Sequence, residues 1–162
     1  MAPISEPKLR FADAVHAIGT TPKQLRNWLQ RRQVPLPPDE AGGWRAFSFC
    51  DIALLAIVRR LADHGVDIER AGVIADAVFY RVAGPLRAFK NTPVPALVAG
   101  FRNRVLIVWR HDGEWPWMLS VGEEIRTPST PAFLTLLLDP IISEAVQRAD
   151  LSAREGKADS SE

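Results

Sequence analysis

The segment Gly19-Thr20-Thr21-Pro22 constrains the fold of this chain more than any other stretch. Thr21 can cap a helix by accepting a hydrogen bond from the backbone N–H of Gln24, whose side chain can in turn accept from the N–H of Thr21. Pro22 suits the first helical position, because an N–H there has no partner within the helix. We therefore expect a helix to begin at residue 22, directly after a glycine that ends another.

Apolar residues on both sides of this glycine repeat at helical spacing. The first set predicts a helix over about 10–18 and the second a helix over 22–31. Two short helices joined by a three-residue turn that contains glycine are typical of a helix-turn-helix. The two apolar stripes consist of Phe11, Ala14, Val15 and Ile18, and of Leu25, Trp28 and Leu29.

Positive charge gathers around these two helices. The whole chain has a formal net charge of +1, but from Lys8 to Arg60 nine Lys and Arg stand against four Asp and Glu, a net charge of +5. From residue 83 onward nine basic residues stand against ten acidic ones. A local excess of cations on a helix-turn-helix is typical of a surface that binds a phosphate backbone.

The chain continues with signals for a wing and two more helices. Prolines and glycines exclude a regular helix over 35–43, and an alternating Trp-Arg-Ala-Phe follows, which predicts a two-stranded wing over 35–47 with its tip at 39–43. Ser48 and Asp51 form a capping pair for a long, buried helix that ends at His64-Gly65. Asp67 then caps a helix over about 68–80, whose small residues suit close packing.

In this order, residues 9–80 resemble the winged helix-turn-helix domain of the MerR family of transcription regulators. The resemblance implies that the helix from Lys23 to Arg31 enters the major groove of DNA and that Arg45 in the wing contacts a phosphate. The matching motifs are Gly19-Thr20-Thr21-Pro22, Leu25-Arg26, Trp28, Gly43-Trp44-Arg45, Phe47-Ser48, Asp51, Arg59-Arg60-Leu61, Gly65 and Ile68-Glu69. The candidate DNA-binding residues are Thr21, Lys23, Gln24, Arg26, Asn27, Trp28, Arg31, Trp44 and Arg45.

The chain departs from the family pattern in three respects. Arg32 and Gln33 stand where the family usually ends its recognition helix with glycine, and Asp39 and Glu40 occupy a wing tip that is commonly basic. The single cysteine, Cys50, lies outside the C-terminal half, where the metal and redox sensors of the family place their cysteines. We therefore expect no metal site and no cofactor.

The second half predicts a small sheet instead of the long coiled coil that follows in the family. Gly84, Pro85, Pro93 and Pro95 interrupt a helix and leave at most a short turn at 85–90. Alternating residues predict strands over 96–101, 104–110 and 114–120, whereas 133–138 fits either a strand or a short helix. Asp139-Pro140 predicts a final helix over about 140–152.

The hairpin around His111-Asp112-Gly113 carries three tryptophans. A three-residue loop there pairs Trp109 with Trp115 and places both, together with Trp117, on one face of the sheet. We expect this face to pack against the final helix or a second subunit.

Together these features predict an α+β fold: an N-terminal winged helix-turn-helix of about four helices and a two-stranded wing, then a small antiparallel sheet and a C-terminal helix. The predicted parts are a DNA-binding domain (1–82), a dimerisation or partner-binding module (83–152) and a flexible tail (153–162). The absence of a run of about 20 apolar residues favours a cytoplasmic, nucleoid-associated protein rather than a membrane protein.

The function indicated is that of a sequence-specific regulator of transcription that binds double-stranded DNA as a homodimer, with a protein partner at the C-terminal module as a further expectation. The alternative is a phage-derived or architectural DNA-binding factor, such as an excision or packaging accessory protein. An enzyme is disfavoured, because His16, His64 and His111 lie in unrelated contexts with no paired nucleophile or carboxylate.

Overall fold

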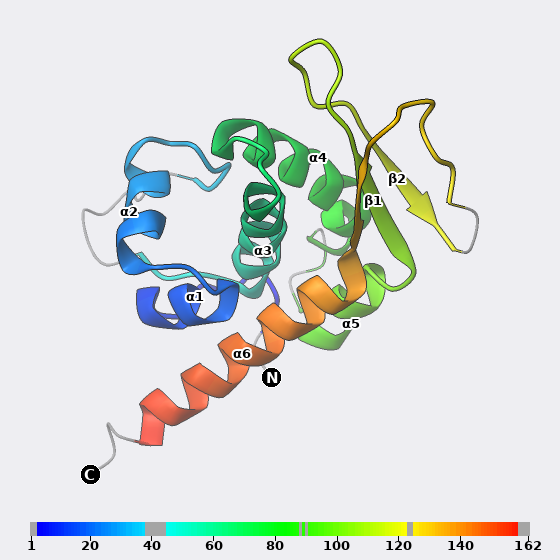
Figure 1. The fold of residues 1–162 in the computed structure, drawn as a ribbon. Coiled ribbons are helices and arrows are strands. Elements are labelled where there is room, and N and C mark those ends of the chain that lie inside the picture. Colours follow the sequence, from blue (N-terminus) through cyan, green and yellow to red (C-terminus); the bar gives the residue numbers. More distant parts are fainter. Residues whose placement is uncertain (1–2, 38–44, 88, 90, 123–124, 159–162) are drawn as a thin grey trace.

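The computed structural model describes residues 3–37, 45–87, 89, 91–122 and 125–158 (Figure 1). Within these residues the chain is an α+β protein with six helices and one three-stranded antiparallel sheet. The helices are α1 (Phe11–Ile18), α2 (Pro22–Gln30), α3 (Phe49–Asp63), α4 (Ile68–Arg87), α5 (Val94–Gly100) and α6 (Leu138–Ala158). The strands are β1 (Arg104–Val108), β2 (Trp117–Val121) and β3 (Leu134–Leu137).

Side-chain caps begin helices α2 and α3 where the sequence predicted them. The Thr21 hydroxyl accepts from the N–H of Gln24 at 3.2 Å, and the Gln24 side chain accepts from the N–H of Thr21 at 3.3 Å. Ser48 and Asp51 make the same reciprocal pair at the start of α3, at 3.1 and 2.8 Å. These caps satisfy N–H groups that have no partner within a helix, which is why they locate a helix start so well.

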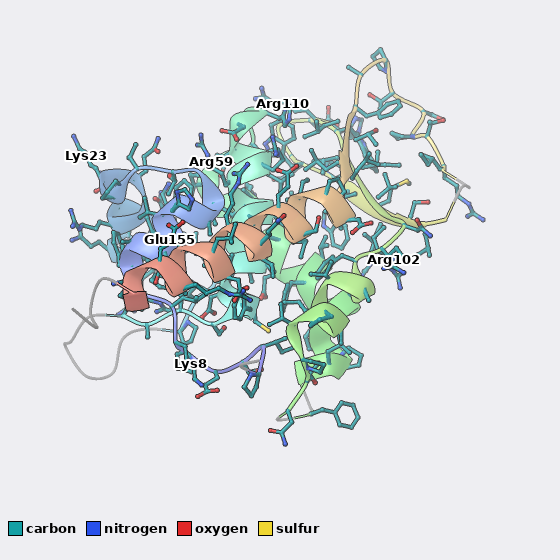
Figure 2. All side chains as sticks on the ribbon, turned by 90° about the horizontal axis from the view of Figure 1, so that it is seen from below. Lys8, Lys23, Arg59, Arg102, Arg110 and Glu155 are labelled. Atoms are coloured by element: carbon teal, nitrogen blue, oxygen red, sulfur yellow. The ribbon has the colours of Figure 1, made fainter. Side chains whose placement is uncertain are left out.

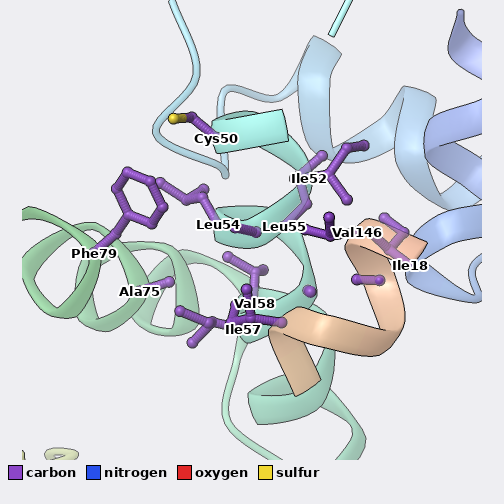
Figure 3. Close-up of a cluster of buried hydrophobic side chains, with 14 of the residues drawn as sticks. Ile18, Cys50, Ile52, Leu54, Leu55, Ile57, Val58, Ala75, Phe79 and Val146 are labelled. Atoms are coloured by element: carbon purple, nitrogen blue, oxygen red, sulfur yellow. The ribbon is translucent and has the colours of Figure 1, made fainter. Parts of the chain in front are cut away.

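Helix α3 lies at the centre of the molecule and is buried on nearly all sides (Figures 1 and 3). Ile52, Leu55 and Ile57 have no exposed surface. Helix α4 supplies Ala75 and Phe79 from one side, and α1 and α6 close the other side with Ile18 and Val146 (Figure 3). One hydrophobic core therefore includes residues from both halves of the chain.

Helix α6 crosses α1 and α3 and completes this core (Figure 1). Ile142, Ala145, Val146 and Ala149 are each at most 5% exposed. The helix spans 138–158 instead of the predicted 140–152, so the expected tail from 153 begins inside it. Where the extension begins, Ser152 donates to Asp13 of α1 at 2.7 Å and Ala153 packs on the core, and both contacts hold the helix against α1 and the core.

The prediction of a two-stranded wing over 35–47 is wrong. Phe47 pairs instead with Leu9, just before α1, through backbone hydrogen bonds of 2.8 and 2.9 Å, and no strand forms among the described residues of this segment. The physical reason is burial: the Phe47 ring has no exposed surface and lies 6.3 Å from the ring of Phe11. The predicted tip at 39–43 and Trp44 lie outside the described residues.

The predicted strand over 96–101 is also wrong, because most of it belongs to helix α5. Val94, Leu97 and Phe101 are buried at helical spacing, and Pro93 and Pro95 stand at the cap and in the first turn, where proline is tolerated. This additional helix accounts for the difference from the predicted number of helices.

Helix α4 does not end near residue 80 but continues through Gly84-Pro85 to Arg87. Its last turns are stabilised by tertiary contacts, since Val82 and Leu86 pack beside Gly100 of α5. Thr92 also donates to the carbonyl of Leu86 at 2.8 Å and so satisfies an acceptor at the helix end.

The sheet has the strand order β2-β1-β3, with the buried strand β1 in the centre. Leu106 of β1 pairs with Leu119 of β2 and with Leu136 of β3, and this face of the sheet joins the core. The open alternative for 133–138 is thereby decided: 134–137 is a strand, and α6 begins at Leu138.

The predicted register of the hairpin is wrong by one residue. His111 pairs with Glu114 around a two-residue turn in which Asp112 and Gly113 have φ of 49° and 81°. Two consecutive positive φ values define a type I′ turn, whose twist matches that of antiparallel strands. Trp109 therefore lies opposite Pro116, on the other face from Trp115 and Trp117.

Candidate nucleic-acid interface

Helices α1 and α2 form a compact pair joined by a tight turn. Gly19 ends α1 with φ of 64°, and its N–H and that of Thr20 donate to the carbonyls of His16 and Val15, each at 3.2 Å. Helix α2 begins three residues after Gly19 and buries Leu25 and Trp28, which are 0% and 6% exposed. These contacts orient the rest of α2 toward solvent.

The outward surface of α2 carries amides and cations. None of these cations is in an ion pair within the part of the chain that the structure describes. Figure 2 shows Lys23 extending from the outer side of α2. The exposed side chains are Lys23, Gln24, Arg26, Asn27, Gln30 and Arg31.

Several predicted contact residues have structural duties as well. The Gln24 side-chain oxygen accepts from Thr20 and Thr21, which leaves its NH₂ group as the donor for a ligand. The Arg26 guanidinium lies 5.3 Å above the Phe11 ring, a cation–π contact between α2 and α1. Trp28 is part of the core, so its side chain positions α2 rather than facing a ligand.

Arg45 lies apart from the row of cations on α2, after the segment that the structure does not describe. It donates to the carbonyl oxygen of Pro37, and its guanidinium lies 5.3 Å above the Phe47 ring. These contacts tie together the two described ends of the predicted wing segment. Trp44, the other predicted contact residue in this segment, lies outside the described residues.

A surface hollow of about 490 Å³ separates α2 from Arg45. Two arginines line it, Arg45 and Arg32, and the sequence-based set of contact residues did not include Arg32. The sequence signal at Arg32 was that it stands where the MerR family usually has a glycine at the end of the recognition helix. The lining residues are Leu29, Gln30, Arg32, Val34, Leu36, Pro37 and Arg45.

Other kinds of site find little support in the described parts of the chain. His16, His64 and His111 are all exposed and lie on α1, at the end of α3 and in the hairpin turn. Among the residues described, no three or more His, Cys, Asp or Glu side chains are grouped so that they could hold a metal ion. None of the described helices is long and apolar enough to cross a membrane.

The fold and this surface define a helix-turn-helix protein whose second helix exposes amides and cations. Residues 9–77 match the family model of the MerR HTH family regulatory protein. The match spans α1 to α3 and about half of α4, includes all nine predicted contact residues, and confirms the resemblance over the N-terminal half. A search of curated proteins found no match to this chain.

Proposed function

We propose that this chain is a sequence-specific DNA-binding regulator of transcription that acts as a homodimer in the cytoplasm, associated with the nucleoid. Helix α2 enters the major groove, and the segment 35–47 contacts the DNA backbone. The observation that carries the proposal is the row of exposed amides and cations on the second helix of a helix-turn-helix. The family match over residues 9–77 supports it.

The side chains divide between reading bases and holding the backbone. Asn27 and the free NH₂ of Gln24 suit the edge of adenine, and Arg31 can present two donors to guanine. Lys23, Arg26 and Arg45 serve as phosphate contacts, which position the protein without reading sequence.

The homodimer follows from the size of the recognition surface. One helix-turn-helix reads only a few base pairs, and such proteins commonly gain specificity by binding two half-sites as a symmetric pair. The module over 83–152 is the proposed source of the dimer or partner contact. Its exposed apolar side chains Val121, Phe133 and Leu137 lie on or beside the edge strands of the sheet.

The salt dependence of DNA binding tests the proposal. With these three phosphate contacts per subunit, the logarithm of the binding constant should fall with the logarithm of salt concentration at a slope of about −5 or steeper for a dimer. Fluorescence anisotropy with a labelled duplex of mixed sequence measures this slope. A slope near zero contradicts the proposal.

Two substitutions distinguish residues that read bases from residues that contact the DNA backbone. Asn27→Ala should relax the preference at one base position, whereas Arg45→Ala should weaken binding to all sequences about equally. A selection from random duplexes, repeated with both variants, measures the two effects. Identical changes in both variants would show that the proposed division is wrong.

Genome-wide mapping of bound DNA tests the regulatory role. Sites distributed near promoters support a transcriptional regulator. A single bound site at a recombination or packaging locus would instead favour an architectural or phage-derived factor.

A further inference from the structure

Three helices of this protein end in the same way, and one of them uses an unexpected residue. One or two residues beyond the end of each helix, the backbone is left-handed: at Gly19 directly after α1 (φ 64°), at Gly65 two residues after α3 (φ 88°) and at Arg32 two residues after α2 (φ 52°). In each case the N–H of this residue donates to the carbonyl three residues before it, and the N–H of the next residue donates to the carbonyl five residues before its own position. This pair of hydrogen bonds is the Schellman motif. At α2 these bonds run from Arg32 to Leu29 at 3.1 Å and from Gln33 to Trp28 at 2.9 Å.

Glycine is the residue that suits this position, since a side chain with a Cβ disfavours a positive φ. The chain uses glycine after α1 and α3, so the arginine after α2 is a departure from its own pattern. The Arg32 side chain is exposed and has no ion pair or hydrogen bond within the residues that the structure describes. The described fold therefore provides no contact that requires the guanidinium.

The location of Arg32 indicates a role outside the fold. It follows the exposed α2 surface directly and lines the same hollow as Arg45 and Gln30. Two arginines that line one hollow raise the local positive potential where a DNA backbone next to α2 would pass. An outlier in backbone geometry is often retained where it serves a ligand.

We propose that Arg32 binds a DNA phosphate at the C-terminal end of the recognition helix and that its left-handed conformation is retained for this contact. The inference rests on the proposed function. It adds a contact that the sequence-based set did not contain, and it predicts opposite changes in stability and in DNA affinity when the side chain is removed.

The test compares Arg32→Gly with Arg32→Lys and with Arg102→Gln. Arg102 is a matched control, because it is also an exposed arginine and lies at the other end of the molecule from Lys23 (Figure 2). Thermal unfolding is followed by circular dichroism. Binding to a labelled mixed-sequence duplex is followed by anisotropy across a salt series.

Arg32→Gly should raise the midpoint of unfolding by about 2 to 4 °C, because glycine removes the unfavourable Cβ. It should also make the salt slope shallower by about 0.9 per subunit, which corresponds to a roughly eightfold loss of affinity per subunit at 0.1 M salt. Arg32→Lys should keep the slope of the wild type, and Arg102→Gln should change neither quantity.

Three results would overturn the inference, and they are distinguishable. Wild-type affinity and slope in Arg32→Gly would show that Arg32 makes no DNA contact. Loss of stability in Arg32→Gly would show that the arginine serves the fold. Failure of the wild type to bind DNA in a salt-dependent way would overturn the proposed function itself, and this inference with it.

Discussion

At the scale of single residues, Asp13 is the group whose chemistry most depends on the fold. It is 1% exposed, yet it accepts from the backbone N–H of Arg10 at 2.8 Å, from the Arg10 guanidinium at 3.3 Å and from Ser152 at 2.7 Å. Burial by itself raises the pKa of Asp13, but the hydrogen bonds from Arg10 and Ser152 outweigh it, so the pKa lies below the ordinary value. The carboxylate thus joins α1 to α6.

This pKa predicts a loss of stability in acid. A carboxyl group with a pKa lowered by folding stabilises the protein above its unfolded pKa, and the contribution is lost as the pH falls through the folded value. The free energy of unfolding should therefore decline from about pH 4 downward. Asp13→Asn should flatten this decline and cost about 1 to 3 kcal/mol at pH 7.

Denaturant titrations between pH 7 and pH 3 measure both effects. Asp63→Asn is the control, because its carboxylate makes a surface ion pair with Arg59 at 2.8 Å and is worth less than about 1 kcal/mol. An Asp13→Asn variant with the same pH profile as the wild type would show that the Asp13 contacts do not stabilise the charged form.

At the scale of elements, Gly72 allows helix α4 to pack closely against residues 33–35, the segment that follows α2. A Cβ at this position would lie 2.7 Å from the carbonyl oxygen of Gln33 and 3.3 Å from Pro35. Only glycine allows the backbone of 33–35 to cross α4 so closely. This close contact is the physical reason for the small residues predicted on this face of the helix.

Gly72→Ala should destabilise the protein by about 1 to 3 kcal/mol, because the neighbour in the way is backbone and must move. Chemical denaturation measures the change. Val73→Ala, one residue further along the same helix and at a position 59% exposed, should change stability by less than about 1 kcal/mol. Equal effects of the two substitutions would contradict the close approach.

The hairpin register assigns different roles to its tryptophans. Trp115 and Trp117 pack against the core, with Arg110 5.9 Å from the Trp115 ring and Arg81 4.7 Å from the Trp117 ring. Trp109 lies on the opposite face of the sheet. Helix α4 therefore contacts the core-facing side of the sheet through Arg81 and Trp117, and it contacts the hairpin through the ion pair of Arg70 with Glu114 at 3.1 Å.

Trp117→Ala should cost about 3 kcal/mol of stability, since it removes both core packing and the cation–π contact with Arg81. Trp109→Ala should cost distinctly less. Thermal unfolding of the two variants, compared at equal concentration, provides the measurement. A larger loss for Trp109→Ala would mean that the other face of the sheet is the one that stabilises the molecule.

At the scale of the whole molecule, α6 connects the two halves of the chain. It packs on α1 and α3, and α3 packs on α4, so removal of its apolar face would expose the core beneath the helix-turn-helix. The division into 1–82 and 83–152 stays a prediction about which part binds DNA. For stability, the shared core leads us to expect one cooperative unit.

Ile142→Ala should lower the stability of the entire chain by about 2 to 4 kcal/mol, because Ile142 is fully buried between the halves. Hydrogen exchange should show equal losses of protection in α3 and in β1. Leu151→Ala on the same helix, 51% exposed, is the control and should have little effect. Loss of protection in β1 alone would indicate two independent units.

Local sequence signals by themselves determined where several helices begin and end and which side of α2 faces solvent. These signals act within a few residues of one another, so they do not depend on the rest of the fold. They are the caps at Thr21 and Ser48, the glycines at 19 and 65, and the helical spacing of Leu25 and Trp28. The candidate residues on α2 could be predicted for the same reason. The sequence also flagged position 32, without showing its left-handed backbone.

Only the tertiary structure decided features that depend on distant partners. Phe47 pairs with Leu9 and not with a strand of a wing hairpin. Helix α4 continues past Pro85 because its residues Val82 and Leu86 pack beside Gly100 of α5. The hairpin has a two-residue turn instead of the predicted three-residue loop, in accord with the backbone geometry of Asp112 and Gly113 and the packing of Trp115 and Trp117 against the core. No local sequence signal determines that α6 packs on α1 and α3. Its apolar face could pack against any complementary apolar surface, and only the assembled core determines which surface it covers.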